Sequence, residues 1–221
     1  MSLLLGSAWQ TTGPRVSDRM RLASHGHVSS RRVLSVKVEC HAKEQRIRRI
    51  VLMRHAPSAE LAGVKDHELP ITQEGQELAK RVAEEMKSLG WIPNIVMSSN
   101  SVRSRQTFEV MKSVIEELSH ADLHFLGSLY TESQLDGHTL PFLARILAVE
   151  ASEEHECVLC LGHNKGWEEA ASILAMESIK LDHCDAALFE AAGDSWAELL
   201  NAENFEQWSC EQLIRADSKA L

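Results

Sequence analysis

The sequence predicts an α/β fold in which helices cover both faces of a largely parallel sheet. Two observations lead to this prediction. From residue 47 onward, short apolar runs alternate with amphipathic stretches, and the connections between them are short and free of internal repeats. In addition, 221 residues, of which 44% are hydrophobic, are enough to bury a core without disulfides or metals. We therefore expect one domain within residues 41–221, with its folded part running from about 46 to 215.

Five runs rich in apolar and β-branched residues predict the strands. In order along the chain they are 47–53, 93–99, 121–130, 157–163 and 184–192. The fourth run contains Cys157 and Cys160, whose spacing also occurs in redox motifs. Because they stand inside an apolar run, and no second pair completes a zinc site, we expect both cysteines to pack as small core residues. The acidic, Trp-bearing end after the fifth run is ambiguous.

Four stretches with apolar residues three and four positions apart predict the helices. In order along the chain they are 72–90, 101–119, 137–151 and 164–176. The first carries Leu78, Val82 and Met86 on one face and ends at Gly90. The third has Pro141 in its first turn, where proline is tolerated. Because helices alternate with strands, the strands of the sheet are expected to run mainly parallel.

The first forty residues differ from the rest in charge and composition. They hold six basic and two acidic residues, a net charge of +4, whereas the remaining chain holds 17 basic and 30 acidic residues, a net charge of −13. They are rich in Ser, Thr and Arg, and VEC at 38–40 resembles a plastid processing site. Residues 1–40 are therefore expected to be a transit peptide to the chloroplast stroma. A mitochondrial signal, or a disordered basic tail on a cytoplasmic protein, are the alternatives, and the cleavage point stays open.

The acidic body of the protein excludes some partners. Non-specific binding of nucleic acid depends on a positive surface, which a net charge of −13 does not offer. No apolar run approaches the roughly 18 residues that cross a bilayer, so no membrane partner is expected either. An anionic substrate would need a local basic pocket that holds it against the overall charge.

Polar groups collect where three of the predicted strands end, and ligands of open α/β sheets bind at this edge. The first strand ends in Arg54 and His55, the second leads into a helix whose first turn carries Arg103, and the fourth ends in His163. Two arginines and two histidines repel one another unless an anion lies among them. Guanidinium groups match phosphate oxygens two at a time, and an imidazole can bond to phosphorus. The pattern therefore predicts a phosphate site.

Other histidines and cations lack such a pattern. Five histidines outside any motif are expected at the surface or in the core: His120, His124, His138, His155 and His183. Arg105 and Lys165 lie near the motifs and are expected to be solvated neighbours of the site.

The motifs around these residues resemble those of the histidine phosphatase superfamily. LMRHAPSA is similar to its Arg-His-Gly signature, with Ala56 in place of the glycine. SSNSVRSRQT is similar to its Ser-Pro-x-x-Arg-Ala-x-Gln-Thr helix start, with Asn100 and Ser104 at the proline and alanine positions. DHELPITQEGQELA resembles its Leu-Thr-x-x-Gly stretch, and LGHNKGWEEAA its second histidine motif. The short body, without long insertions, looks most similar to the SixA-type phosphohistidine phosphatases.

The resemblance implies a fold, a mechanism and a set of site residues. The fold is a three-layer α/β/α sandwich around a mainly parallel central sheet. His55 is the nucleophile that becomes phosphorylated, and Arg54, Arg103 and His163 form the phosphate pocket. Ser58, in the loop after the nucleophile, could add a hydrogen bond to the phosphate. Neither a metal nor an organic cofactor is implied.

The proton donor is the open part of this assignment. Many members of the family use a carboxylic acid after the middle strand, a role that needs a raised pKa. Glu132 is the best placed candidate here, and Asp136 is the second. SixA-type proteins lack the usual acid, which is chemically reasonable because a phosphoramidate leaves as an imidazole that is easily protonated.

We therefore expect an enzyme that hydrolyses a phosphoric monoester or a phosphoramidate through a phosphohistidine on His55. Its partner would be a phosphorylated small molecule or a phosphoprotein, and the physiological substrate and the oligomeric state stay open. A phosphoglycerate mutase-like phosphotransferase is one alternative, although a mutase usually carries an insertion that shields the phosphoenzyme from water. A catalytically idle module that binds phosphate or a partner is another, and the presence of both histidines and both arginines argues against it.

Overall fold

The computed structural model describes residues 46–132, 135 and 137–217. The expected transit peptide at 1–40 and the candidate acid Asp136 lie outside the described residues. In the part of the chain that is described, no helix is long and apolar enough to cross a membrane.

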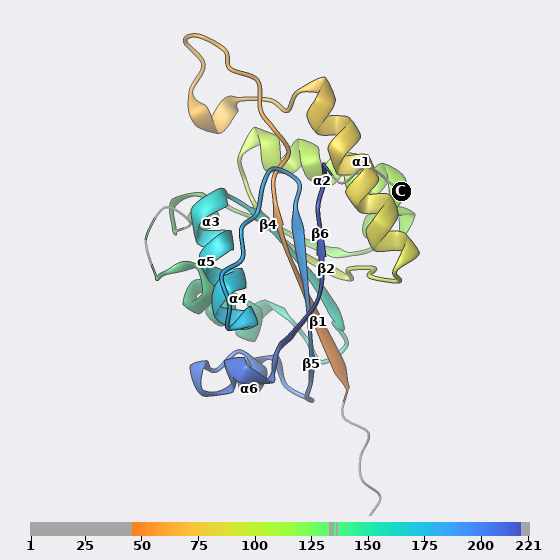
Figure 1. Ribbon diagram of the computed structural model, residues 1–221, viewed down its shortest axis with the longest axis vertical. Coiled ribbons are helices and arrows are strands. Elements are labelled where there is room, and N and C mark those ends of the chain that lie inside the picture. Colours follow the sequence, from red (N-terminus) through yellow and green to blue (C-terminus); the bar gives the residue numbers. More distant parts are fainter. Residues whose placement is uncertain (1–45, 133–134, 136, 218–221) are drawn as a thin grey trace, which may run out of the picture. The chain divides into compact units, whose positions relative to one another are not determined.

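A six-stranded sheet lies at the centre of the described domain (Figure 1). Its strands are β1 (Ile47–Arg54), β2 (Ile95–Ser99), β3 (Asp122–Leu126), β4 (Cys157–Gly162), β5 (Ala186–Ala192) and β6 (Ser209–Ile214). They lie in the order β3-β2-β4-β1-β5-β6, and the first four in this order pair in parallel. β5 pairs antiparallel with both β1 and β6. The prediction of a mainly parallel sheet is confirmed, with two antiparallel pairings at one side.

Helices cover both faces of this sheet. They are α1 (Gln73–Ser88), α2 (Val102–Val114), α3 (Gly127–Glu132), α4 (Thr139–Glu150), α5 (Asn164–Ala175) and α6 (Trp196–Leu199). In Figure 1, α1 and α2 lie on one side of the sheet, and α3, α4 and α5 lie on the other. The expected three-layer sandwich is confirmed.

The central strand β1 contributes to two separate cores because successive side chains of a strand point to opposite faces. Ile50 and Leu52 pack on the side of α4 and α5, whereas Val51 and Met53 pack on the side of α1 and α2. All four side chains are at most 2% exposed. Both helical layers thus hold the strand, and the position of Arg54 at its carboxyl end is fixed.

The two cysteines of β4 belong to this core. Cys157 and Cys160 are free and buried, as their apolar surroundings predict. Burial raises the pKa of the Cys157 thiol to about 12, so the group stays protonated and packs as a small apolar side chain.

The predicted strand at 121–130 is correct only in its first half. β3 ends at Leu126, which pairs with Ser99, the last residue of β2. Beyond this point the neighbouring strand offers no further hydrogen bonds, and the chain turns into α3 at Gly127. This helix buries Leu129 and places Tyr130 near the carboxyl ends of the strands.

The strand predicted at 184–192 is confirmed, but it is not the last strand of the sheet. The run is β5, but it is followed by β6, an edge strand whose sequence alternates polar and half-buried residues instead of forming an apolar run. Two tryptophans of the ambiguous segment, Trp196 and Trp208, are buried in the core, where their rings stack with centroids 6.4 Å apart. β5 also runs opposite to β1, with Met53 paired to Ala186 and Ile47 to Ala192.

The direction of β5 has a structural consequence for the residues just before it. Helix α5 starts directly after β4, at the carboxyl edge of the parallel strands, and β5 begins at that same edge. The connecting segment therefore returns to this edge, where the amide of Cys184 donates to the carbonyl of Arg54 (3.2 Å). Residues 181–185 thus lie beside the end of β1.

Candidate active site

His55 follows the last residue of β1 and is only 6% exposed. Its Nδ1 lies 2.7 Å from the carbonyl of Ala56, and because a carbonyl only accepts, this nitrogen carries the proton. Its Nε2 accepts a hydrogen bond from Nε of Arg103 (3.1 Å). Burial, helped by repulsion from His163 and Arg103, lowers the pKa of His55 from 6.5 to about 2. His55 is therefore a neutral imidazole whose Nε2 lone pair faces a guanidinium.

Arg103 stands in the first turn of α2 and is likewise 6% exposed. Besides its bond to His55, its Nη1 donates to the carbonyl of Asp66 (2.5 Å) and its Nη2 to the carboxylate of the same residue (2.8 Å). Asp66 belongs to a short 3₁₀ turn, Asp66–Glu68, in the loop between β1 and α1. Tyr130 of α3 also donates to this carboxylate (2.6 Å). Both partners lower the pKa of Asp66, so its carboxylate stays ionised.

His163 comes directly after β4, as the residue preceding the first turn of α5. Its Nδ1 lies 3.5 Å from Nη2 of Arg103, which can only donate, so the proton is on Nε2 and is given to Oγ of Ser99 (2.8 Å). Its ring lies 5.0 Å from that of His55, centroid to centroid. Burial, together with Arg103, lowers the pKa of His163 to about 4. It too is neutral near pH 7.

Arg54 completes the cluster from the end of β1. Its Nη1 donates to the carbonyl of Leu181 (3.1 Å) and its Nη2 to Nε2 of His183 (3.0 Å). Its Nε is buried and has no hydrogen-bond partner among the described residues. Desolvation lowers the pKa of this guanidinium, although an arginine stays charged at physiological pH. The cluster thus holds two cations and three neutral imidazoles, an arrangement suited to an anion.

The structure brings together the four residues that the strand-end pattern singles out, and it places the other two candidates differently. The carboxylate of Glu132 lies 3.4 Å from Nδ1 of His138, and both residues line a small hollow beside α4. Ser58 follows the nucleophile in the loop and forms a backbone bridge with Ile71. The described contacts of Glu132 and Ser58 are not with the histidines of the cluster.

Sequence reasoning missed three contributors. His183, expected at the surface or in the core, lies in the cluster, its ring 5.4 Å from that of His55. Asp66 and Tyr130 were not considered, although Asp66 opens the DHELPIT stretch that resembles a family motif. No spacing signal identifies His183, because its place depends on the direction of β5. Of the expected neighbours, Arg105 stacks on Phe125 (4.1 Å to the ring centroid).

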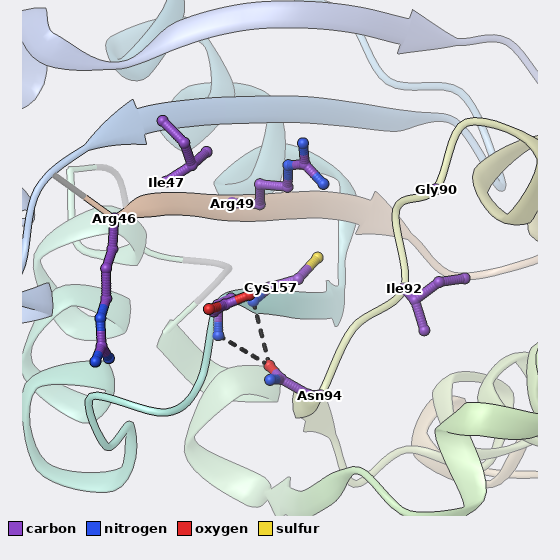
Figure 2. A pocket seen from close by; sticks show the side chains of 8 residues that line it. Arg46, Ile47, Arg49, Gly90, Ile92, Asn94 and Cys157 are labelled. Carbon is purple, nitrogen blue, oxygen red and sulfur yellow. Dashed lines mark hydrogen bonds between the residues drawn. The ribbon is translucent and has the colours of Figure 1, made fainter. Parts of the chain in front are cut away.

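A second hollow, of about 320 Å³, lies at the opposite edge of the sheet, beside the first residues of β1 and β4 (Figure 2). Arg49 is one of the residues that line it, but its Nε is paired with Glu190 (2.9 Å). The side chain of Asn94 accepts from the amide of Cys157 (3.2 Å), as Figure 2 shows. No histidine is among the residues that line this hollow, so it offers no nucleophile of the kind found at the carboxyl edge.

Comparison with known proteins agrees with this geometry. Residues 50–123, which hold three of the four motifs, match the model of the histidine phosphatase superfamily, branch 1. An uncharacterized protein of Arabidopsis thaliana, named as chloroplastic, is 38% identical over 172 residues, which are 77% of this chain and 79% of that protein. The relative supports a common family over nearly the whole described domain.

Solved structures share the fold. A SixA protein from Nakamurella multipartitia superposes with a TM-score of 0.64 at 20% identity, over 78% of this chain and 98% of that one. A protein histidine phosphatase SixA in complex with tungstate gives a TM-score of 0.61 at 16% identity, over 76% and 97%. Fold, motifs and relatives lead to one conclusion: the chain belongs to the histidine phosphatase superfamily.

Proposed function

We propose that the protein is a phosphatase that moves a phosphoryl group from its substrate to His55 and from there to water. The observation that carries the proposal is the hydrogen-bond geometry of His55, whose Nδ1 lies against a carbonyl and whose Nε2 accepts from Arg103. With a pKa of about 2, this imidazole is neutral at physiological pH. No proton has to leave the nucleophile before it attacks.

In the first step, the Nε2 lone pair forms a bond to phosphorus, and the bond from phosphorus to the leaving group breaks with its electron pair. The leaving group then takes up a proton. In the second step, a water oxygen attacks phosphorus, the electrons of the P–N bond return to Nε2, and inorganic phosphate leaves. Arg54, Arg103 and His163 surround the nucleophile and would stabilise the charge on the transferring phosphoryl oxygens.

The leaving group must take up a proton, and this requirement limits which substrates the site can hydrolyse. The described contact of Glu132 is with His138 and not with the histidines of the cluster, and Tyr130 and Arg103 keep the carboxylate of Asp66 ionised. Neither residue is therefore placed or charged as a general acid for the leaving group. A phosphohistidine leaves as an imidazole, which takes up a proton easily. The names of the two SixA structures, which refer to phosphohistidine and protein histidine phosphatases, support the same choice. We therefore favour phosphohistidine in a protein as the substrate, with a small phosphate ester as the second candidate.

The decisive experiment measures release of inorganic phosphate by the full-length protein from phosphohistidine and from p-nitrophenyl phosphate. We expect turnover of both, faster on phosphohistidine, and a phosphoenzyme that is stable in alkali and labile in acid. His55→Ala should lose activity by at least about 1,000-fold because the covalent route is gone. Activity of this variant within about tenfold of wild type would exclude His55 as the nucleophile.

The same assay separates the alternatives. A mutase would pass the phosphoryl group to a phosphoglycerate hydroxyl and release little inorganic phosphate. An idle module would bind tungstate, a phosphate mimic, without turnover. The alternatives therefore differ in product and not only in rate.

A plastid location is part of the proposal. It is supported by the name of the Arabidopsis relative, which is chloroplastic, and by the basic, hydroxyl-rich composition of residues 1–40. Fusion of these residues to a fluorescent protein should direct it into chloroplasts of leaf cells. A fusion that stays in the cytosol would contradict this part alone and leave the enzymatic proposal standing.

A further inference from the structure

We propose that His183 is a positioning residue for phosphoryl transfer, which holds the guanidinium of Arg54 in the direction in which it meets the phosphoryl group. The inference rests on the proposed function of the site, but it assigns a role to a residue that lies outside the family motifs of this sequence. Its evidence is the geometry around Arg54 and the construction of the segment that carries His183.

Two acceptors from one segment determine the orientation of Arg54. His183 Nε2 accepts from one terminal nitrogen (3.0 Å) and the carbonyl of Leu181 accepts from the other (3.1 Å). Two bonds in the plane of a guanidinium fix both its tilt and its rotation. The Nε–H of Arg54 is buried and has no partner among the described residues. The ring of His183 lies 5.4 Å from that of His55, so the oriented cation stands beside the nucleophile.

The segment that presents His183 is built rigidly. Cys184 adopts φ 66°, a left-handed conformation that costs free energy for a residue with a Cβ. The neighbouring carboxylate of Asp185 holds the turn, because it accepts from the amides of Asp182 (3.0 Å) and Ala216 (2.9 Å) and from Arg215 (2.6 Å). Strain of this kind persists only where the surroundings enforce it, and it is often found at functional sites.

His183 can play this role only as a neutral imidazole, because a protonated ring has no acceptor for Arg54. The charged groups that face it are Arg54, Arg103, Asp182 and Asp185, and the ring of His55 lies next to it. Burial is the largest cause that lowers the pKa of His183, followed by repulsion from Arg54. The bond to Arg54 is therefore present at neutral pH.

The test uses the full chain, with substitutions of His183 and of its partner Arg54, alone and combined. His183→Ala removes the acceptor, and we expect kcat/KM for phosphohistidine to fall by about 10- to 100-fold, as for a misplacement of a binding group by roughly 1 Å. His183→Gln keeps an acceptor oxygen and should recover most of this loss. In an Arg54→Ala background, His183→Ala should cost almost nothing more, because its effect passes through Arg54. His124→Ala, at the far edge of the sheet in β3, is the matched control and should keep wild-type activity.

Tungstate binding measured by calorimetry gives a readout that does not depend on turnover. If wild type binds tungstate but hydrolyses nothing, the proposed function fails, and weaker binding by His183→Ala with recovery by His183→Gln still supports the positioning role. The inference is overturned if His183→Ala leaves both kcat/KM and tungstate affinity unchanged. It is also overturned if the losses from Arg54→Ala and His183→Ala are additive, or if a folded His183→Gln is no better than alanine. Circular dichroism and thermal melts establish that each variant is folded.

Discussion

Arg48 and Arg54 stand near opposite ends of the same strand, β1, and their guanidinium groups meet different partners. Arg48, with no exposed surface, donates to the carbonyls of Glu153 (2.9 Å), His155 (2.5 Å) and Asp194 (2.8 Å). It also pairs with the carboxylate of Glu153 (2.7 Å). Arg54 has a carbonyl and an imidazole for partners, and no carboxylate among the described residues lies within ion-pair distance of it.

The difference separates a structural cation from a binding one. At the amino edge, the charge of Arg48 is neutralised within the protein, and its hydrogen bonds tie the strand to the loop before β4. At the carboxyl edge, Arg54 and three imidazoles stand together, and burial with mutual repulsion lowers the pKa of each. Unmatched positive charge in a buried place costs stability, and an anionic ligand relieves that cost. Four predictions test this contrast.

The largest expected effect is that of acid on the carboxyl edge. The folded pKa values of His55 (about 2) and His163 (about 4) lie below the ordinary 6.5, so below pH 6.5 the unfolded chain binds more protons than the folded one. The contribution of these two histidines to the free energy of unfolding is complete above pH 6.5, and it is lost as the pH falls toward their pKa values in the folded state. From pH 7 to 5 the two histidines should together lower the free energy of unfolding by about 4 kcal/mol. Urea unfolding of wild type and of the double variant His55→Gln/His163→Gln measures this, and an equal pH slope for both would contradict it.

Next in size is the loss of the structural cation. Arg48→Met keeps much of the volume but leaves three carbonyls without their donor, and we expect the free energy of unfolding to fall by about 3 kcal/mol. This loss lies at the low end of the range expected for breaking a buried ion pair, because the side chain of Glu153, 64% exposed, can turn to water. The folded fraction should keep wild-type kcat/KM. A large loss of activity in folded Arg48→Met would show that the two edges are not independent.

Third is the loss of the binding cation at Arg103. Arg103→Ala should lower kcat/KM by about 100-fold, since it removes a charge-assisted donor from a buried site. Its effect on the melting temperature should be smaller than that of Arg48→Met. Arg103→Lys should recover only part of the rate, because lysine lacks the planar fork. Near wild-type kinetics for Arg103→Ala would remove this residue from the site.

The smallest effect concerns the carboxylate that Arg103 already holds. Asp66→Asn removes the negative charge that competes with phosphate for the guanidinium, so tungstate should bind about fivefold more tightly, the equivalent of roughly 1 kcal/mol. Glu68→Gln, an exposed acid of the same 3₁₀ turn, is the matched control and should not change the affinity. Weaker binding by Asp66→Asn would mean that the carboxylate organises the site instead of competing for it.

The sequence was informative where the site depends on parallel strands. Arg54 ends such a strand, His55 and His163 directly follow one, and Arg103 lies in the first turn of the helix after one. The carboxyl ends of parallel strands meet at one edge. Periodicity alone therefore brings these four together.

The remaining site residues depend on features that have no local signal. His183 is in the site because β5 reverses direction, and an apolar run reads the same in either direction. Asp66 is there because a loop folds back onto α2, and Tyr130 because β3 ends four residues earlier than its composition suggests, at Leu126. β6 was missed because an edge strand with alternating polar residues carries no strong apolar pattern.

The contact between Asp66 and Arg103 bears on how the enzyme would finish each reaction cycle. When inorganic phosphate leaves, Asp66 can take back the two terminal nitrogens of Arg103, one with its backbone carbonyl and the other with its carboxylate. Departure of the product is then an exchange of one anion for another, so the guanidinium is not left bare and the barrier to release is reduced. In the proposed reaction, the loop that carries Asp66 would thereby limit inhibition by the product phosphate.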